Sequence, residues 1–242
     1  LDSMRAVLMS LGVVLHSANL YSTEKDWLIY SQDSSAAAFY LSSIIHIFRM
    51  PAFFVVSGYF CLLTLEKYSA SKFLAFRMQR IGIPLLSTAI LLNTLQSYIL
   101  NSLGWEAESA TTFMFEGGWV SHLWFLNNLI IYFLGAYFLA ISCKASLKKV
   151  GQSLAKILNT TPLFLVILLA PFVQIGFLAL YKIGLPIYAN VGGVLFIYSI
   201  LSYLPFFLFG LLLRSNGELL DRFSTIPWIF MVPAIVIAAS IQ

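Results

Sequence analysis

Apolar stretches of about 17–25 residues follow one another along the chain and are separated by short polar segments. A helix of that length, rising about 1.5 Å per residue, crosses a hydrocarbon core about 30 Å thick. Hydrophobic residues make up 60% of the chain and charged residues only 10%, whereas a soluble domain carries about 25% charged residues. Stretches such as LLSTAILLNTLQSYIL lack the alternation of membrane β-barrel strands. The sequence predicts an all-α, polytopic bundle of transmembrane helices.

We expect seven helices in a single membrane domain that covers residues 1–242. No basic leader with a small-residue cleavage site precedes the first apolar stretch, which is therefore predicted to span the membrane. The last stretch has only about 16 apolar residues, which is short for a complete span, and the chain starts at Leu1 rather than Met. We expect a truncated chain, with further helices after its C-terminus. The expected spans are roughly 3–21, 39–65, 81–103, 120–142, 161–181, 190–213 and 226–242.

The positive charges are concentrated in alternate loops. Segments 66–80, 143–160 and 214–225 hold most of the Lys and Arg residues, and the loops between them hold few. Because cytoplasmic loops carry the excess of Lys and Arg, these three segments and the N-terminus are predicted to be cytoplasmic. The membrane topology thus accounts for the net charge of +4. We expect the protein to be surrounded by membrane lipid and not to bind nucleic acid.

Two basic residues, Arg5 and His16, mark the first helix. They are eleven residues apart, which is about three turns, so they share a face to within about 20° and lie about 16 Å apart along the axis. Ionisable groups inside a membrane are costly and indicate function by default. The alternative is that Arg5 is an interfacial anchor and His16 a hydrogen-bonded packing residue.

The second helix carries His46 and Arg49 one turn apart, at a depth expected to match that of His16. An intramembrane Arg keeps its charge, so Arg49 requires a carboxylate, carbonyl groups, water or an anionic ligand. The alternative is a structural Arg that holds carbonyls freed by Pro51, whose ring removes a backbone donor.

Two further groups of polar residues are candidates for binding. Arg77 and Arg80, in the segment FRMQRIGIP, are three residues apart and can clamp phosphate oxygens, or serve as ordinary cytoplasmic anchors. His122 and Trp124, in WVSHLWFLNN, lie at the outer start of the fourth helix. No Cys or carboxylate is spaced as a partner ligand to the histidines, so we expect no metal site.

The order of these segments is more informative than any one of them. LDSMRAVLMSLGVVLHS, HIFRMPAFFVVSGYF, FRMQRIGIPLL and SHLWFL follow one another in the chain, and this order resembles the family-3 membrane acyltransferases. The similarity is greater to the branch that succinylates osmoregulated periplasmic glucans, in which a similar Tyr-Ser-Thr follows the first helix. The resemblance covers residues 1–142 well, whereas the remaining residues match the family only in their hydropathy. Ala6 stands where many members have Gly.

The resemblance implies an integral protein of the bacterial inner membrane that moves a succinyl or acetyl group. The donor would be cytoplasmic acyl-CoA (succinyl-CoA or acetyl-CoA), a co-substrate rather than a permanently bound cofactor. The acceptor would be a hydroxyl of a periplasmic glucan or other glycan. Arg77 and Arg80 are hypothesised to hold the coenzyme A phosphates, while Arg5 guides the thioester into the bundle.

On the acceptor side, His16 is the hypothesised general base, because its ordinary pKa is near 6.5. Arg49 would neutralise the thioester oxyanion or the free carboxylate of a succinyl donor. The acceptor would be lined by His46, His122 and Trp124, with the aromatic rings stacking on sugars.

Two other functions remain open from the sequence. One is O-acetylation of a surface polysaccharide or a small molecule by acetyl-CoA. The other is a non-enzymatic transporter whose intramembrane His and Arg bind an anionic substrate.

Overall fold

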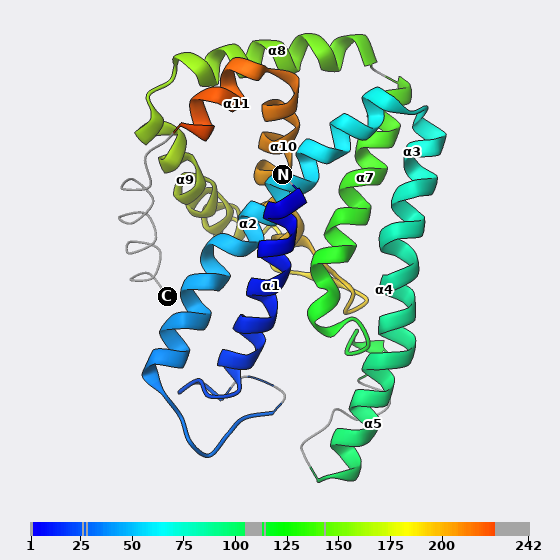
Figure 1. Ribbon diagram of the computed structural model, residues 1–242, viewed down its shortest axis with the longest axis vertical. Coiled ribbons are helices and arrows are strands. Elements are labelled where there is room, and N and C mark those ends of the chain that lie inside the picture. The colour runs from blue at the N-terminus through cyan, green and yellow to red at the C-terminus, as the bar shows by residue number, and fades with distance from the viewer. Residues whose placement is uncertain are drawn as a thin grey trace.

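The computed structural model describes residues 2–25, 27, 29–104, 113, 115–142 and 144–225. All the long elements in these residues are helices, which confirms the predicted all-α fold, and the two strands have two residues each. The longest helices run side by side (Figure 1). They are α1 (Asp2–Asn19), α2 (Ala36–Lys67), α7 (Trp124–Ser142), α9 (Leu163–Lys182) and α10 (Ile197–Ser215).

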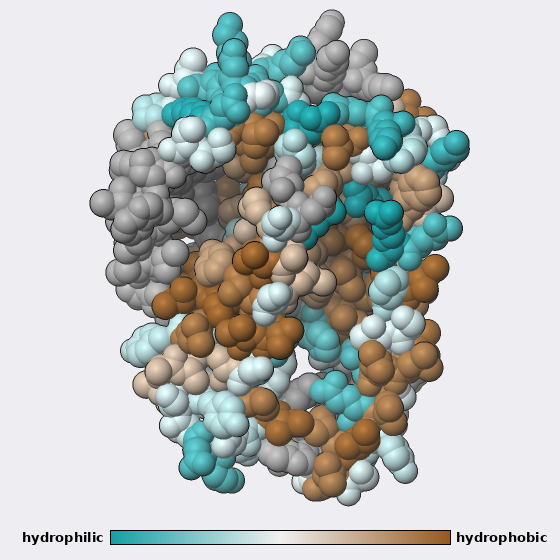
Figure 2. Space-filling model, in the orientation of Figure 1, coloured by the Kyte–Doolittle hydropathy of each residue, from teal (hydrophilic) through white to brown (hydrophobic). Residues whose placement is uncertain are grey.

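Four helical segments of the described chain are long and apolar enough to cross a membrane: Ala36–Lys67, Ala70–Ser102, Ser121–Ser142 and Ile197–Ser215. Figure 2 shows hydrophobic side chains across the middle of the molecule and many hydrophilic ones gathered at its top. We call that end the upper end, as it is drawn in Figure 1, and the opposite end the lower end. This distribution is the one that a bilayer requires.

The predicted span 81–103 is wrong at its start, because the helix begins eleven residues earlier, at Ala70. It comprises α3 (Ala70–Arg77), α4 (Ile83–Ser87) and α5 (Thr94–Ser102), joined by wider π-helical turns. Ser69 starts the helix by accepting a hydrogen bond from the backbone of Lys72. The basic segment that we assigned to a loop is therefore helical.

The predicted span 190–213 is also wrong at its start. Residues 190–196 form a small antiparallel hairpin of β1 (Asn190–Val191) and β2 (Leu195–Phe196), and α10 begins only at Ile197. Gly192 and Gly193 have φ angles of 62° and 70°, a conformation that glycine adopts without steric cost and that hairpin turns need. The two glycines thus form a turn within the apolar stretch that the sequence predicts as helix, and the helix starts after this turn.

Two of the segments that the sequence predicts as loops are helices at the upper end: α8 (Lys144–Thr160) and the shorter α11 (Gly217–Ser224) (Figure 1). Arg222 of α11 donates hydrogen bonds of 2.6 Å to the carbonyls of Leu158, Asn159 and Thr161, at the end of α8. A cation at a helix C-terminus satisfies the carbonyls that lack intrahelical partners. The predicted span 226–242 lies outside the described residues.

The backbones of α2 and α10 lie close together at two glycines. A Cβ atom on Gly58 would collide with the carbonyl oxygen of Phe207, and one on Gly210 would collide with that of Val55. Small residues permit such close packing of membrane helices. Near the upper end, Arg214 of α10 pairs with Glu66 of α2 at 2.6 Å. The two helices therefore form one fixed unit.

We expect Gly210→Ala to destabilise the protein by about 1–3 kcal/mol, because the added methyl group must push α10 away from α2. Thermal unfolding of the detergent-solubilised protein measures this as a lower Tm. Gly135→Ala in α7 is the matched control, since a Cβ there meets nothing within 4 Å. Equal Tm values for the two variants would contradict the close crossing.

Candidate functional site

The three histidines of the chain and Arg49 form one cluster, which we call the histidine cluster. The rings of His16 and His122 have centroids 6.1 Å apart, and His16 also lies within electrostatic range of His46 and Arg49. These residues come from the last turn of α1, from α2 and from the 3₁₀ turn Ser121–Leu123 before α7. Within the described residues, no three His, Cys, Asp or Glu side chains are placed to hold a metal ion.

Arg49 crosses from α2 to α1. Its Nε donates a hydrogen bond of 2.9 Å to the carbonyl of Leu8, and its guanidinium covers Gly12, where a Cβ would lie only 2.8 Å from Arg49 Cζ. Glycine is thus the residue that leaves room for the guanidinium. The contact with Leu8 is made to the neighbouring helix rather than to carbonyls freed by Pro51. Arg49 consequently lies against α1 between Arg5 and His16.

The ring of His16 is half-buried. It packs against the indole of Trp27, with ring centroids 5.0 Å apart and an interplanar angle of 30°. Its Nδ1 is buried, and no described residue hydrogen-bonds to it. A ring nitrogen without a protein partner remains able to accept a proton or a hydrogen bond.

A second basic group lies near the upper end of α1. It consists of Arg5, Arg77 and Arg80, and we call it the arginine cluster. Arg5 stacks on the ring of Phe60, with its Cζ 3.5 Å from the ring centroid. Arg77 donates hydrogen bonds to the carbonyl of Phe60 at 2.6 Å and to Thr64 Oγ1 at 2.9 Å. Arg5 and Arg77, 72 positions apart in sequence, therefore meet at one residue of α2.

Arg77 and Arg80 differ in environment. Arg77 is half-buried, and its guanidinium lies 4.8 Å from the ring centroid of Phe133 and 5.6 Å from that of Phe73. Arg80 is exposed on the π-helical turn Met78–Gly82. The two side chains do not share a single surface, although the charges of Arg80 and Arg5 both act on Arg77. The phosphate clamp stays a prediction, with Arg80 as its accessible member.

Trp124 packs in the core rather than against a histidine ring. Its indole centroid lies 5.4 Å from the ring of Tyr203, and Tyr203 in turn stacks on the fully buried Phe54. The aromatic residue that contacts His16 is Trp27, which is not among the site residues predicted from the sequence. Trp27 lies in the connection between α1 and α2, where no helical periodicity indicates which side chains turn inward.

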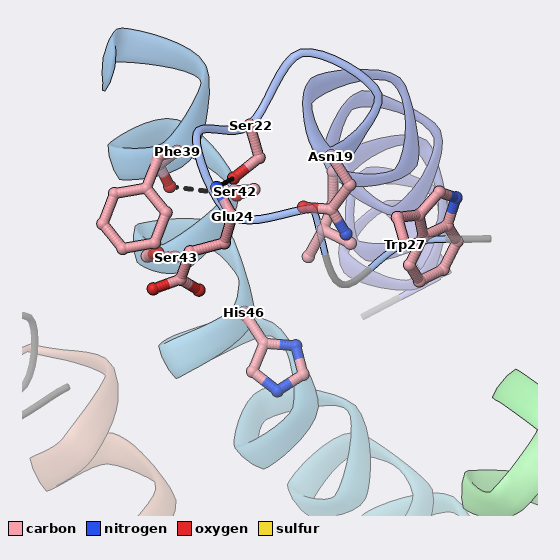
Figure 3. A pocket seen from close by; sticks show the side chains of 9 residues that line it. Asn19, Ser22, Glu24, Trp27, Phe39, Ser42, Ser43 and His46 are labelled. Atoms are coloured by element: carbon pink, nitrogen blue, oxygen red, sulfur yellow. Dashed lines mark hydrogen bonds between the residues drawn. The ribbon is translucent and has the colours of Figure 1, made fainter. Parts of the chain in front are cut away.

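A cavity of about 370 Å³ lies between the end of α1, the start of α2 and the connection between them (Figure 3). Of the predicted site residues, His46 lines it. Trp27 is also in its wall, so the cavity adjoins the His16 ring. The wall consists of Leu15, Asn19, Ser22, Glu24, Trp27, Phe39, Ser42, Ser43 and His46.

The geometry thus gives α1 two basic groups, the arginine cluster near its start and the histidine cluster near its end, and Arg49 of the histidine cluster lies against the middle of α1. Comparison with known proteins agrees with a membrane enzyme family. The model of the Acyl_transf_3 acyltransferase domain matches residues 1–242. No solved structure matches the chain.

The curated relatives include glucans biosynthesis protein C of Escherichia coli strain K12, 32% identical over 93% of this chain. The proteins of that name from Escherichia coli O157:H7 and Shigella dysenteriae serotype 1 are each 31% identical over 93% of the chain. The chain spans 60% of the length of these relatives. The match of the domain model to residues 1–242 and the identity to these relatives show that the chain belongs to the Acyl_transf_3 family of acyltransferases.

Proposed function

We propose that this chain belongs to an integral O-acyltransferase of the bacterial inner membrane that moves an acyl group from cytoplasmic acyl-CoA to a periplasmic glycan hydroxyl. The observation that carries the proposal is the face of α1 that packs on α2. Arg5 lies at one end of this face, Arg49 covers its middle and His16 lies at the other end. The N-terminus and the upper end are cytoplasmic in this scheme, because α8 and α11 carry basic residues there.

On the donor side, the arginine cluster offers guanidinium groups to the phosphates of coenzyme A. Arg80 is exposed and is accessible to the phosphates of a soluble acyl-CoA. Arg5 and the half-buried Arg77 add positive charge near it. Phosphate oxygens accept charge-assisted hydrogen bonds from arginine. The pantetheine arm then extends along α1 toward Arg49, since Arg5 and His16 are separated by about 16 Å on the helix axis.

On the acceptor side, His16 removes the proton from the attacking hydroxyl. The hydroxyl oxygen bonds to the thioester carbon, Arg49 balances the oxyanion, and the C–S bond breaks to release coenzyme A as a thiolate. The thiolate takes the proton from His16, which returns to its neutral form. A succinyl donor would place its free carboxylate within the same basic cluster.

The names of the relatives favour a glucan acceptor for this chain. Membranes that contain the full-length protein, incubated with labelled acetyl-CoA or succinyl-CoA, test the proposal. Label in a glycan together with free coenzyme A supports it, and the mass added to the glycan identifies the acyl group. Translocation of an anionic solute without release of coenzyme A would instead indicate a transporter.

We expect His16→Ala to lower kcat for acyl transfer by about 10²–10⁴-fold, because the hydroxyl then loses its general base. Acyl transfer is measured after a thermal melt has shown that the variant is folded. Ser17→Ala, at the exposed neighbouring position, is the control and should retain wild-type kcat. Wild-type transfer by folded His16→Ala would exclude His16 as the base.

We expect Gly12→Ala to lower kcat on the order of 10- to 100-fold while every charged residue is kept. The new methyl group displaces the guanidinium of Arg49 from α1, and misplacement of a catalytic group by about 1 Å can cost 10²-fold. Gly176→Ala in α9, where a Cβ meets nothing within 4 Å, serves as the comparison. If Gly12→Ala turns over like wild type, the position of Arg49 against α1 is unimportant for the reaction.

We expect Arg80→Gln to raise the KM for acyl-CoA about tenfold with little change in kcat. One charge-assisted hydrogen bond contributes about 1.5–3 kcal/mol, and the acyl-transfer site is at the other end of α1. Lys72→Gln removes an exposed charge from the same long helix and is the matched control. Equal KM values for both variants would exclude Arg80 from donor binding.

A further inference from the structure

The cavity at the lower end is built by three parts of the chain that meet there. Asn19 ends α1, Ser42 and His46 lie on the first turns of α2, and Glu24 and Trp27 come from the connection between them (Figure 3). The buried Ser22 hydroxyl accepts a hydrogen bond of 3.2 Å from the backbone N–H of Glu24. This local turn fixes the backbone that carries Glu24 into the wall.

The lining of the cavity combines two aromatic rings with many hydrogen-bonding groups. Trp27 and Phe39 supply apolar rings, while Asn19 and Ser43 supply an amide and a hydroxyl. A sugar has the same combination, because its hydroxyls donate and accept hydrogen bonds while its C–H surfaces pack on an aromatic ring.

Charge restricts the ligand further. Among the described residues that line the cavity, Glu24 is the one acidic side chain, and none is Lys or Arg. A carboxylate accepts hydrogen bonds from sugar hydroxyls and repels a second carboxylate. Glu24 thus favours a neutral ligand although Arg49 and the histidines lie close by.

The cavity is also placed next to the proposed chemistry. Trp27 is in its wall and packs directly on the ring of His16, and His46 lines it while acting electrostatically on His16. A sugar held in the cavity therefore lies beside the residue that would remove its proton.

We propose that this cavity is the acceptor subsite and binds an uncharged sugar unit. Trp27 provides the stacking surface, and Glu24 accepts hydrogen bonds from sugar hydroxyls and discriminates against anionic acceptors. The assignment rests on the proposed function, because the acceptor is a glycan only if the chain serves acyl transfer to one. Glu24 and Trp27 are specificity-determining residues in this scheme.

A labelling experiment tests the site without relying on turnover. Ser43→Cys is introduced into the detergent-solubilised full-length protein and treated with a maleimide, with and without a neutral glucose tetrasaccharide. We expect the tetrasaccharide to slow labelling at least fivefold, and a tetrasaccharide containing glucuronic acid to protect much less. Ser153→Cys, at an exposed position of α8, controls for effects on the reagent and should be labelled equally in all samples.

Two variants test the role of charge. Glu24→Gln is expected to raise the KM for the neutral acceptor about five- to tenfold and to reduce discrimination against the glucuronic acid analogue, with the KM for acyl-CoA unchanged. Asp33→Asn, an exposed carboxylate of the same connection outside the cavity wall, should behave as wild type in each assay.

The outcomes separate the two proposals. Acyl transfer to a glycan without protection of Ser43→Cys by saturating acceptor would overturn the subsite and leave the acyltransferase proposal intact. Protection by the neutral tetrasaccharide without transfer from acyl-CoA would overturn the proposed function and support a carbohydrate site. Stronger protection by the glucuronic acid analogue would overturn the role of Glu24.

Discussion

The packing of α1 against α2 depends on the position of one permanent positive charge inside the bundle, that of Arg49. Arg49 cannot shed its charge in a membrane, and its Nε is satisfied by the carbonyl of Leu8 on the neighbouring helix. That bond requires a backbone without a side chain at Gly12 and fixes the height of α1 against α2. With this register, His16 reaches the level of His46 and Arg5 reaches that of Phe60.

The membrane class and the gathering of the histidines were accessible from the sequence. The lengths of the apolar stretches indicate the membrane class, because transmembrane helices are among the few structures in which every backbone N–H and C=O group is hydrogen-bonded within lipid. The gathering of the histidines follows from their positions along their helices, since His16 lies in the last turn of α1 and His46 lies about three turns into α2, on either side of the same connection. The structure brings both residues together with His122.

The sequence was less informative where local backbone chemistry interrupts a periodic pattern. The helix of Arg77 and Arg80 contains a π-helical turn just before Pro84, and one residue points into the bundle while the other is exposed. Gly192 and Gly193 convert part of an apolar stretch into a hairpin. Glu24 and Trp27 lie in a connection without periodicity, so only the folded chain shows that they line the cavity.

The close glycine crossing has a consequence for how α2 can respond to a ligand. Above Pro51, α2 is held to α10 at Gly58 and by the Glu66–Arg214 pair. Below Pro51, the same helix lines the cavity with His46. Proline lacks a backbone donor, so α2 bends most easily at that point. Pro51 therefore separates an upper half of α2, which is fixed to α10, from a lower half that lines the cavity and is tied to α1 through Arg49.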